Sequence, residues 1–259
     1  MNRRRPHRIV PGAVADLAER RRPDTLFWVD PASVGSDRLK LSPDESHHLL
    51  RVHRAKEGTP FQAIDGEGSF FECVLESVER RAAIGRIVGR REGVGELTRT
   101  IVVLVGLPDS GDVDEVVAHG VPLGVNAFDF VVCERSGRAA LKSPRLGRLG
   151  RIARAGLKQS RRTRLPEMRS SGSLGEALKH LPSGLRFAAD PAGEEPTPAL
   201  VKTSEDPVTL AIGPPGGYTE GERRLLQEEH FSIISLGPSR LTTETAALAL
   251  ISLARNSLR

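Results

Sequence analysis

Two glycine-proline turns, each directly after an apolar strand-like run, constrain this chain more than any other feature. Residues 208–212 (Val-Thr-Leu-Ala-Ile) precede the turn 213–217 (Gly-Pro-Pro-Gly-Gly), and residues 231–236 precede Gly237-Pro238. The carboxyl ends of parallel strands meet at one edge of a sheet, where backbone N–H groups and helix N-termini gather. The sequence therefore predicts an α/β domain with a ligand site at that edge.

The residues around the first turn predict a preformed cavity. Thr219 and Glu222 have the spacing of a capping box, which closes the first turn of a helix. Glycines at 213, 216 and 217 can adopt positive φ or let a ligand approach bare backbone, whereas the two prolines stiffen the loop. The second turn leads in the same way into an apolar helix with a threonine as its predicted N-cap.

Taken together, the two turns carry a family resemblance. Ile212-Gly213-Pro214-x-Gly216-Gly217 and Leu236-Gly237-Pro238-x-x-Leu241-x-Thr243-Glu244-Thr245-Ala246 resemble the closing motifs of the SPOUT methyltransferases that methylate N3 of a uridine in 16S ribosomal RNA. The resemblance implies a trefoil-knotted α/β domain, a homodimer and S-adenosyl-L-methionine as cofactor. The cofactor-binding residues that it implies are Ala189, Gly213, Pro214, Gly216, Gly217, Leu236, Gly237, Leu241 and Thr243.

The rest of the chain predicts two further segments. Residues 1–24 form a basic extension that either binds RNA phosphates or is a solvated tail. Residues 25–96 contain four strand-like runs and one helix that begins at the capping box Ser42–Glu45, which predicts a small β-barrel. The order of these elements resembles the PUA-like, RNA-binding domain of the same methyltransferases. The knotted domain would then occupy residues 97–259.

Arginine dominates the predicted RNA contacts. Lysine and arginine number 38 against 33 acidic residues, and aromatic residues are only 4% of the chain, so a base-stacking platform is poorly supplied. Seven arginines between residues 145 and 164 have no acid among them, which favours phosphate binding over an ordinary solvated helix face. The candidate RNA-binding residues are Arg54, Arg145, Arg148, Arg151, Arg154, Arg161 and Arg164.

Several other classes of protein are disfavoured. Cys73 and Cys133 lie far apart in apolar runs, and His47, His48 and His53 lack ligand partners at suitable spacing, so no metal site is expected. No glycine-rich dinucleotide fingerprint and no P-loop follows a strand. The absence of a long apolar run or a signal sequence predicts a cytoplasmic protein that does not enter a membrane.

Methylation of uridine at N3 requires a base for the N3 proton and a cation for the charge that spreads onto the uracil oxygens. The candidate cations are Arg135, in a Glu-Arg pair that matches the family, and Arg162, in a matching Gln-Ser-x-Arg-x-x-x-Pro-Glu signature. Glu244 is the candidate base, although a glutamate at a helix start can also serve only to satisfy amides.

This sequence departs from the family pattern at several charged positions. Pro215 replaces a glutamate, Thr242 an arginine, His119 a lysine, Pro122 a glutamate and Lys158 a further glutamate, the one before Gln159-Ser160. Two functions therefore remain open at this point. One is uridine-N3 methylation of 16S ribosomal RNA, and the other is RNA binding by a diverged homologue whose catalysis is lost or altered.

Overall fold

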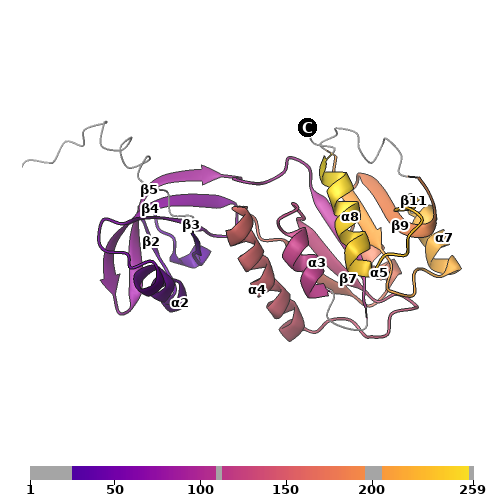
Figure 1. Ribbon diagram of the computed structural model, residues 1–259, viewed down its shortest axis with the longest axis horizontal. Helices are drawn as coiled ribbons and strands as arrows, with labels where there is room; N and C mark the ends of the chain where they lie inside the picture. The colour runs from indigo at the N-terminus through magenta and orange to yellow at the C-terminus, as the bar shows by residue number, and fades with distance from the viewer. Residues whose placement is uncertain (1–24, 109–112, 196–205, 257–259) are drawn as a thin grey trace, which may run out of the picture. The chain divides into compact units, whose positions relative to one another are not determined.

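The computed structural model describes residues 25–108, 113–195 and 206–256, and the basic extension of residues 1–24 lies outside this range (Figure 1). The described chain divides into two units. Residues 25–65 and 69–92 form the first, and residues 66–68 together with those from 93 onward form the second. Residues 93–96, expected at the end of the first domain, group with the second because Arg162 binds the Glu96 carboxylate.

The first unit is a five-stranded sheet with one helical segment. Its sheet order is β1-β3-β4-β5-β2. The strands are β1 (Leu26–Trp28), β2 (Arg38–Lys40), β3 (Pro60–Ile64), β4 (Ser69–Glu79) and β5 (Ala82–Glu92). A short 3₁₀ turn, η1 (Pro31–Ser33), lies between β1 and β2. The apolar residues of the strands, with Phe27, Phe61 and Phe71 at the centre, form one buried core.

The helix of this unit begins where the sequence predicted. The hydroxyl of Ser42 accepts a hydrogen bond from the N–H of Glu45, and Pro43 opens α2 (Pro43–His47). The helix then widens into a π-turn, η2 (His48–Val52). Leu49 points into the core, whereas Val52 is exposed.

The second unit is a six-stranded parallel sheet with the order β11-β9-β10-β6-β7-β8. Its strands are β6 (Ile101–Gly106), β7 (Ala127–Val131), β8 (Glu167–Ser171), β9 (Leu185–Glu194), β10 (Val208–Ile212) and β11 (Ser232–Ile234). β10 is buried throughout, as expected for a central strand covered on both faces. The expected parallel α/β sheet is therefore present.

Helices cover both faces of this sheet (Figure 1). On one face, α3 (Val113–Gly120) lies between α4 (Ser143–Ser160) and α8 (Thr243–Asn256), and α8 packs on β6 and β10. On the other face, α5 (Leu174–Leu178) and α7 (Glu220–Glu228) share a core with Leu104, Ala188 and Ala211. The sequence did not predict β2, β8 or α5, since short or polar segments carry little periodicity. The trefoil knot stays a prediction.

Candidate functional site

The two glycine-proline turns open at the same edge of the sheet. β10 and β11 both run parallel to β9, which lies between them, so Gly213 and Leu236 follow strands that end on one side. Ala189 of β9 is the direct neighbour of Ile212. The predicted third wall of the cofactor site is thus beside the first turn.

Hydrogen bonds join the two turns across this edge. The Thr243 hydroxyl donates to the Gly213 carbonyl over 3.2 Å, and Arg240 Nη2 donates to the Pro215 carbonyl over 3.3 Å. A cavity of 350 Å³ lies between the turns, lined by Pro215, Arg240, Leu241, Thr242, Thr243 and Glu244. Its volume is within the range of small-molecule sites, about 300–1,000 Å³.

Glycine is required in this site for two different reasons. Gly217 and Gly237 have backbone φ values of 69° and 110°, which residues with a Cβ rarely adopt. At Gly216 and Gly106 the reason is space. A Cβ on Gly216 would lie 3.0 Å from Cβ of Arg135, and a Cβ on Gly106 would lie 2.4 Å from the Pro214 nitrogen. The glycines leave a bare-backbone cradle of the kind that a bound cofactor would need.

Arg135 lies at the candidate site, as predicted. Its Nη1 donates to the Gly216 carbonyl over 2.9 Å and to the Tyr218 carbonyl over 3.4 Å. Arg240 binds the neighbouring carbonyl of Pro215, so two guanidinium groups contact consecutive residues of the first turn. The loop that carries Arg135 is held by Glu222, whose carboxylate accepts the N–H groups of Glu134 and Thr219, each over 2.9 Å.

Glu244, the candidate base, lines the cavity. One of its carboxylate oxygens accepts a hydrogen bond from the Thr242 hydroxyl, and the other is buried with no hydrogen-bond partner among the described residues. Two other titratable groups nearby are unsuited to this role. Burial raises the pKa of both the Cys133 thiol and the Tyr218 phenol well above their ordinary values, so both are protonated at neutral pH.

Arg162, the second candidate cation, is not placed for catalysis. Its side chain is 2% exposed and pairs with Glu96 over 2.7 Å. Its Nη1 also donates to the carbonyls of Val121 and Val125 over 2.6 and 2.9 Å. Because these bonds occupy the guanidinium inside the core, we assign Arg162 a structural role in place of the predicted catalytic one.

Four of the predicted RNA-binding arginines form a strip on α4: Arg145, Arg148, Arg151 and Arg154. An acid from another helix partly neutralises this α4 strip. Asp114 of α3 binds Arg145 and Arg148, each over 2.8 Å. Arg151 is exposed and makes no ion pair with a residue that the structure describes, and Arg154 is also exposed. Residues 145–164 therefore contain no acidic residue in the sequence, but the fold places the acid Asp114 beside them.

The remaining predicted RNA-binding arginines, Arg54, Arg161 and Arg164, lie on irregular segments. Arg54 is exposed with φ of 52°, and Arg161 caps α4 with φ of 62°. Arg164 is exposed, and its backbone N–H donates to the Glu96 carboxylate over 2.8 Å.

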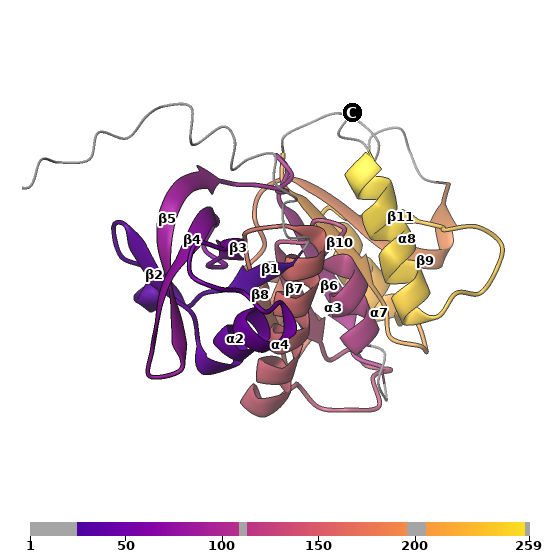
Figure 2. The ribbon, with the colours of Figure 1, turned by 60° about the vertical axis from the view of Figure 1, so that its left-hand side comes forward.

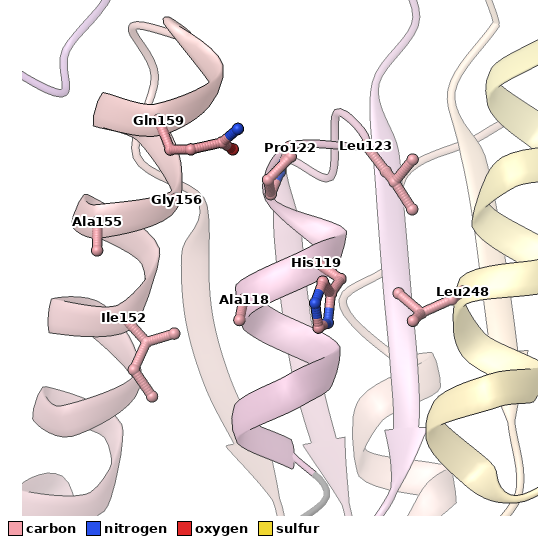
Figure 3. Close-up of a pocket in the computed structure, with 9 residues that line it drawn as sticks. All are labelled: Ala118, His119, Pro122, Leu123, Ile152, Ala155, Gly156, Gln159 and Leu248. Carbon is pink, nitrogen blue, oxygen red and sulfur yellow. The ribbon is translucent and has the colours of Figure 1, made fainter. Parts of the chain in front are cut away.

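A second cavity, of 670 Å³, lies among α3, α4 and α8 (Figure 3). Its lining is mainly apolar and comprises Ala118, His119, Pro122, Leu123, Ile152, Ala155, Gly156, Gln159 and Leu248. Leu248 of α8 extends toward α3, the helix that carries His119. Two of the five departures from the family pattern, His119 and Pro122, thus line this groove, whereas Pro215 and Thr242 line the cavity beside Glu244.

Sequence inspection missed Arg240 and Glu96. Arg240 occupies an unspecified position within the second motif, directly before Leu241, and only the meeting of the two turns shows that it faces Pro215. Glu96 was expected only as the last residue of the first domain, yet its carboxylate accepts hydrogen bonds from Arg162 and from two backbone N–H groups.

Among the described residues no helix could cross a membrane, and no group of acidic, histidine and cysteine side chains could hold a metal ion.

Comparisons with known proteins agree with this architecture. A model of the RNA methyltransferase domain matches residues 95–255, and a model of the RNA methyltransferase PUA domain matches residues 41–88. The ribosomal RNA small subunit methyltransferase E of Synechocystis sp. is 28% identical over 86% of this chain and 75% of its own length. The enzyme of that name from Bacillus subtilis is 26% identical, over 83% and 88%.

Solved structures give the same result. The probable rRNA-methyltransferase of Porphyromonas gingivalis is similar with a TM-score of 0.78 and 28% identity, over 88% of this chain and 95% of that one. The ribosomal RNA small subunit methyltransferase E of Neisseria gonorrhoeae, bound to S-adenosyl methionine, is similar with a TM-score of 0.76 and 25% identity, over 88% and 94%.

Proposed function

The chain belongs to the RNA methyltransferase family, and we propose that it transfers a methyl group from S-adenosylmethionine to N3 of a uridine in 16S ribosomal RNA. One observation carries the proposal. The cavity between the glycine-proline turns is lined by one cation, Arg240, and one carboxylate, Glu244, and Arg240 binds the Pro215 carbonyl of the glycine-rich turn. These are the two charged groups that attack by a uridine nitrogen requires.

The residues of the site have distinct proposed roles. Cofactor contacts come from the turn 213–217, from Leu236, Gly237, Leu241 and Thr243, and from Ala189, and the bound S-adenosylmethionine supplies an activated methyl group. The free carboxylate oxygen of Glu244 takes the proton from N3 of the uridine. Arg240 and Arg135 then offset the negative charge that forms on the uracil oxygens. Pro215 and Thr242 leave this cation and base in place.

The reaction can be tested on ribosomal RNA. Small subunits from a strain that lacks this gene are incubated with the purified protein and S-adenosylmethionine, and the RNA is digested and analysed by mass spectrometry. We expect one additional N3-methyluridine per 16S RNA. Methylation of another base, or none, would contradict the proposed function.

Cofactor binding should depend on Gly106, although this residue lies outside the family motifs. Gly106→Ala places a Cβ against the backbone of Pro214, so the turn must shift, and we expect S-adenosylmethionine affinity to fall about 10–100-fold. Calorimetry measures the affinity. Gly147→Ala in α4 is the matched control, since its Cβ meets nothing within 4 Å. Equal affinity of both variants with the parent would place the cofactor elsewhere.

RNA binding is proposed to use the part of the α4 strip that Asp114 leaves uncompensated. Arg151→Gln should make the slope of log affinity against log salt less steep by about 0.7–0.9, since one phosphate contact is lost. Arg145→Gln should change the slope less, because Asp114 already offsets that charge. Filter binding of 16S RNA at several salt concentrations gives both slopes. A larger effect at Arg145 would be evidence against this assignment.

The homodimer is proposed to form through the groove among α3, α4 and α8. From the sequence alone, four alanines of the last helix were expected to allow close helix approach in the dimer: Ala246, Ala247, Ala249 and Ala254. Ala247 and Ala254 are fully buried inside the unit itself, whereas Ala246 and Ala249 are partly exposed. Leu123 and Leu248 line the groove. Leu248→Glu should therefore convert a dimer into a monomer of 28.1 kDa in light scattering, while Arg151→Gln, outside the groove, should not. A parent protein that is already monomeric would rule the dimer out.

A further inference from the structure

The turn between β4 and β5 holds two arginines in a conformation that suits glycine. Glu79 pairs with Ala82, so Arg80 and Arg81 alone connect the strands. Their φ values are 46° and 71°, as a two-residue hairpin turn of type I′ demands. Asn-Gly is the preferred sequence for such a turn, and side chains with a Cβ make it less stable. Arginine at both positions works against the stability of the hairpin.

The backbone next to this turn is firmly held, while both arginines are exposed. Figure 2 shows β4 and β5, the strands that the turn connects, as neighbours in the first unit. The N–H of Ala83 donates to the hydroxyl of Ser46 over 2.8 Å, and the carbonyl of Ala83 accepts the N–H of Leu41 over 3.0 Å. Ser46 is fully buried. The hairpin therefore presents two guanidinium groups from a fixed base, which lowers the entropy that a ligand must remove.

The charges of these two arginines are uncompensated, unlike those of their neighbours in the sheet. Arg38 pairs with Glu76, Arg90 with Glu92 and Arg91 with Glu72. Arg80 and Arg81 make no ion pair with any residue that the structure describes. The adjacent acid, Glu79, acts electrostatically on Arg38. Two adjacent positive charges thus remain available to an anion.

Arginine with a positive φ also occurs at other positions of the described chain. Of the five non-glycine residues with positive φ in the described chain, four are arginines: Arg54, Arg80, Arg81 and Arg161. We infer that Arg80 and Arg81 bind neighbouring phosphates of the RNA substrate, and that this contact keeps arginine at a turn where Asn-Gly would be more stable. The inference rests on the proposed function, since an RNA substrate supplies the phosphates.

A double substitution separates the effect of the two arginines on the stability of the hairpin from their effect on RNA binding. Arg80→Asn with Arg81→Gly installs the preferred turn, so the thermal unfolding midpoint should rise by about 2–4 °C. Affinity for 16S ribosomal RNA at about 0.15 M salt should fall on the order of 10-fold, with a salt slope less steep by about 1.4–1.8. S-adenosylmethionine affinity should stay unchanged. Filter binding, calorimetry and circular dichroism supply these quantities.

The control retains the charge and the strain together. Arg80→Lys with Arg81→Lys should bind RNA with nearly the salt slope of the parent and gain no thermal stability. A raised midpoint with unchanged RNA affinity in the Asn-Gly variant would overturn the inference alone. Failure of the parent to bind 16S RNA would overturn the proposed function and this inference with it.

Discussion

Replacing Glu244 with glutamine is expected to lower the rate of methyl transfer by about 10²–10⁴-fold, the usual contribution of a general base. The carboxylate oxygen that faces no protein partner becomes part of a neutral amide, which cannot accept the N3 proton. The Thr242 hydroxyl can still donate to the remaining amide oxygen, so the helix start should persist. Single-turnover methylation of small subunits measures the rate.

A second measurement distinguishes a base from a helix-capping residue. S-adenosylmethionine affinity of Glu244→Gln should remain within about twofold of the parent, because glycine turns rather than this carboxylate carry the proposed cofactor contacts. Raising the pH should partly restore the rate as the uridine itself begins to ionise. Glu220→Gln, exposed at the start of α7, is the control. Full activity of Glu244→Gln would remove the residue from the mechanism.

Glu96→Gln is expected to destabilise the second unit by about 3–5 kcal/mol, the usual cost of leaving one partner of a buried ion pair alone. Arg162 is 2% exposed, so its guanidinium cannot turn to water when the carboxylate is lost. The N–H groups of Thr163 and Arg164 lose a charged acceptor in the same variant. Thermal unfolding followed by circular dichroism measures the loss.

Two further variants separate the ion pair from its neighbours. Adding Arg162→Met to Glu96→Gln should recover part of the lost stability, since the unpaired buried charge is gone. Glu167→Gln breaks the exposed pair with Arg169 and should cost no more than about 1 kcal/mol. If Glu96→Gln and Glu167→Gln unfold at the same temperature, the Glu96–Arg162 pair is not a structural centre of this unit.

The sequence by itself was sufficient for the elements whose signals are local. Apolar β-branched residues in 208–212 marked a buried strand, and the spacing of Thr219 and Glu222 marked a capping box that is present. The order of strands and turns then indicated that both glycine-proline turns share one edge, because parallel strands end on the same side. The match of the RNA methyltransferase and PUA models confirms the family that these motifs resembled.

Only the tertiary structure decided which charged residues are available to bind a ligand and which are paired within the protein. Arg162 is buried and pairs with Glu96, 66 positions away. Arg145 and Arg148 share the single carboxylate of Asp114, more than 30 positions away, which offsets part of their charge. Arg240 gained its place in the cavity from contact with Pro215, 25 positions earlier. The charge of a side chain is written in the sequence, but its partners and its access to solvent arise when distant segments pack, and these determine what the charge can do.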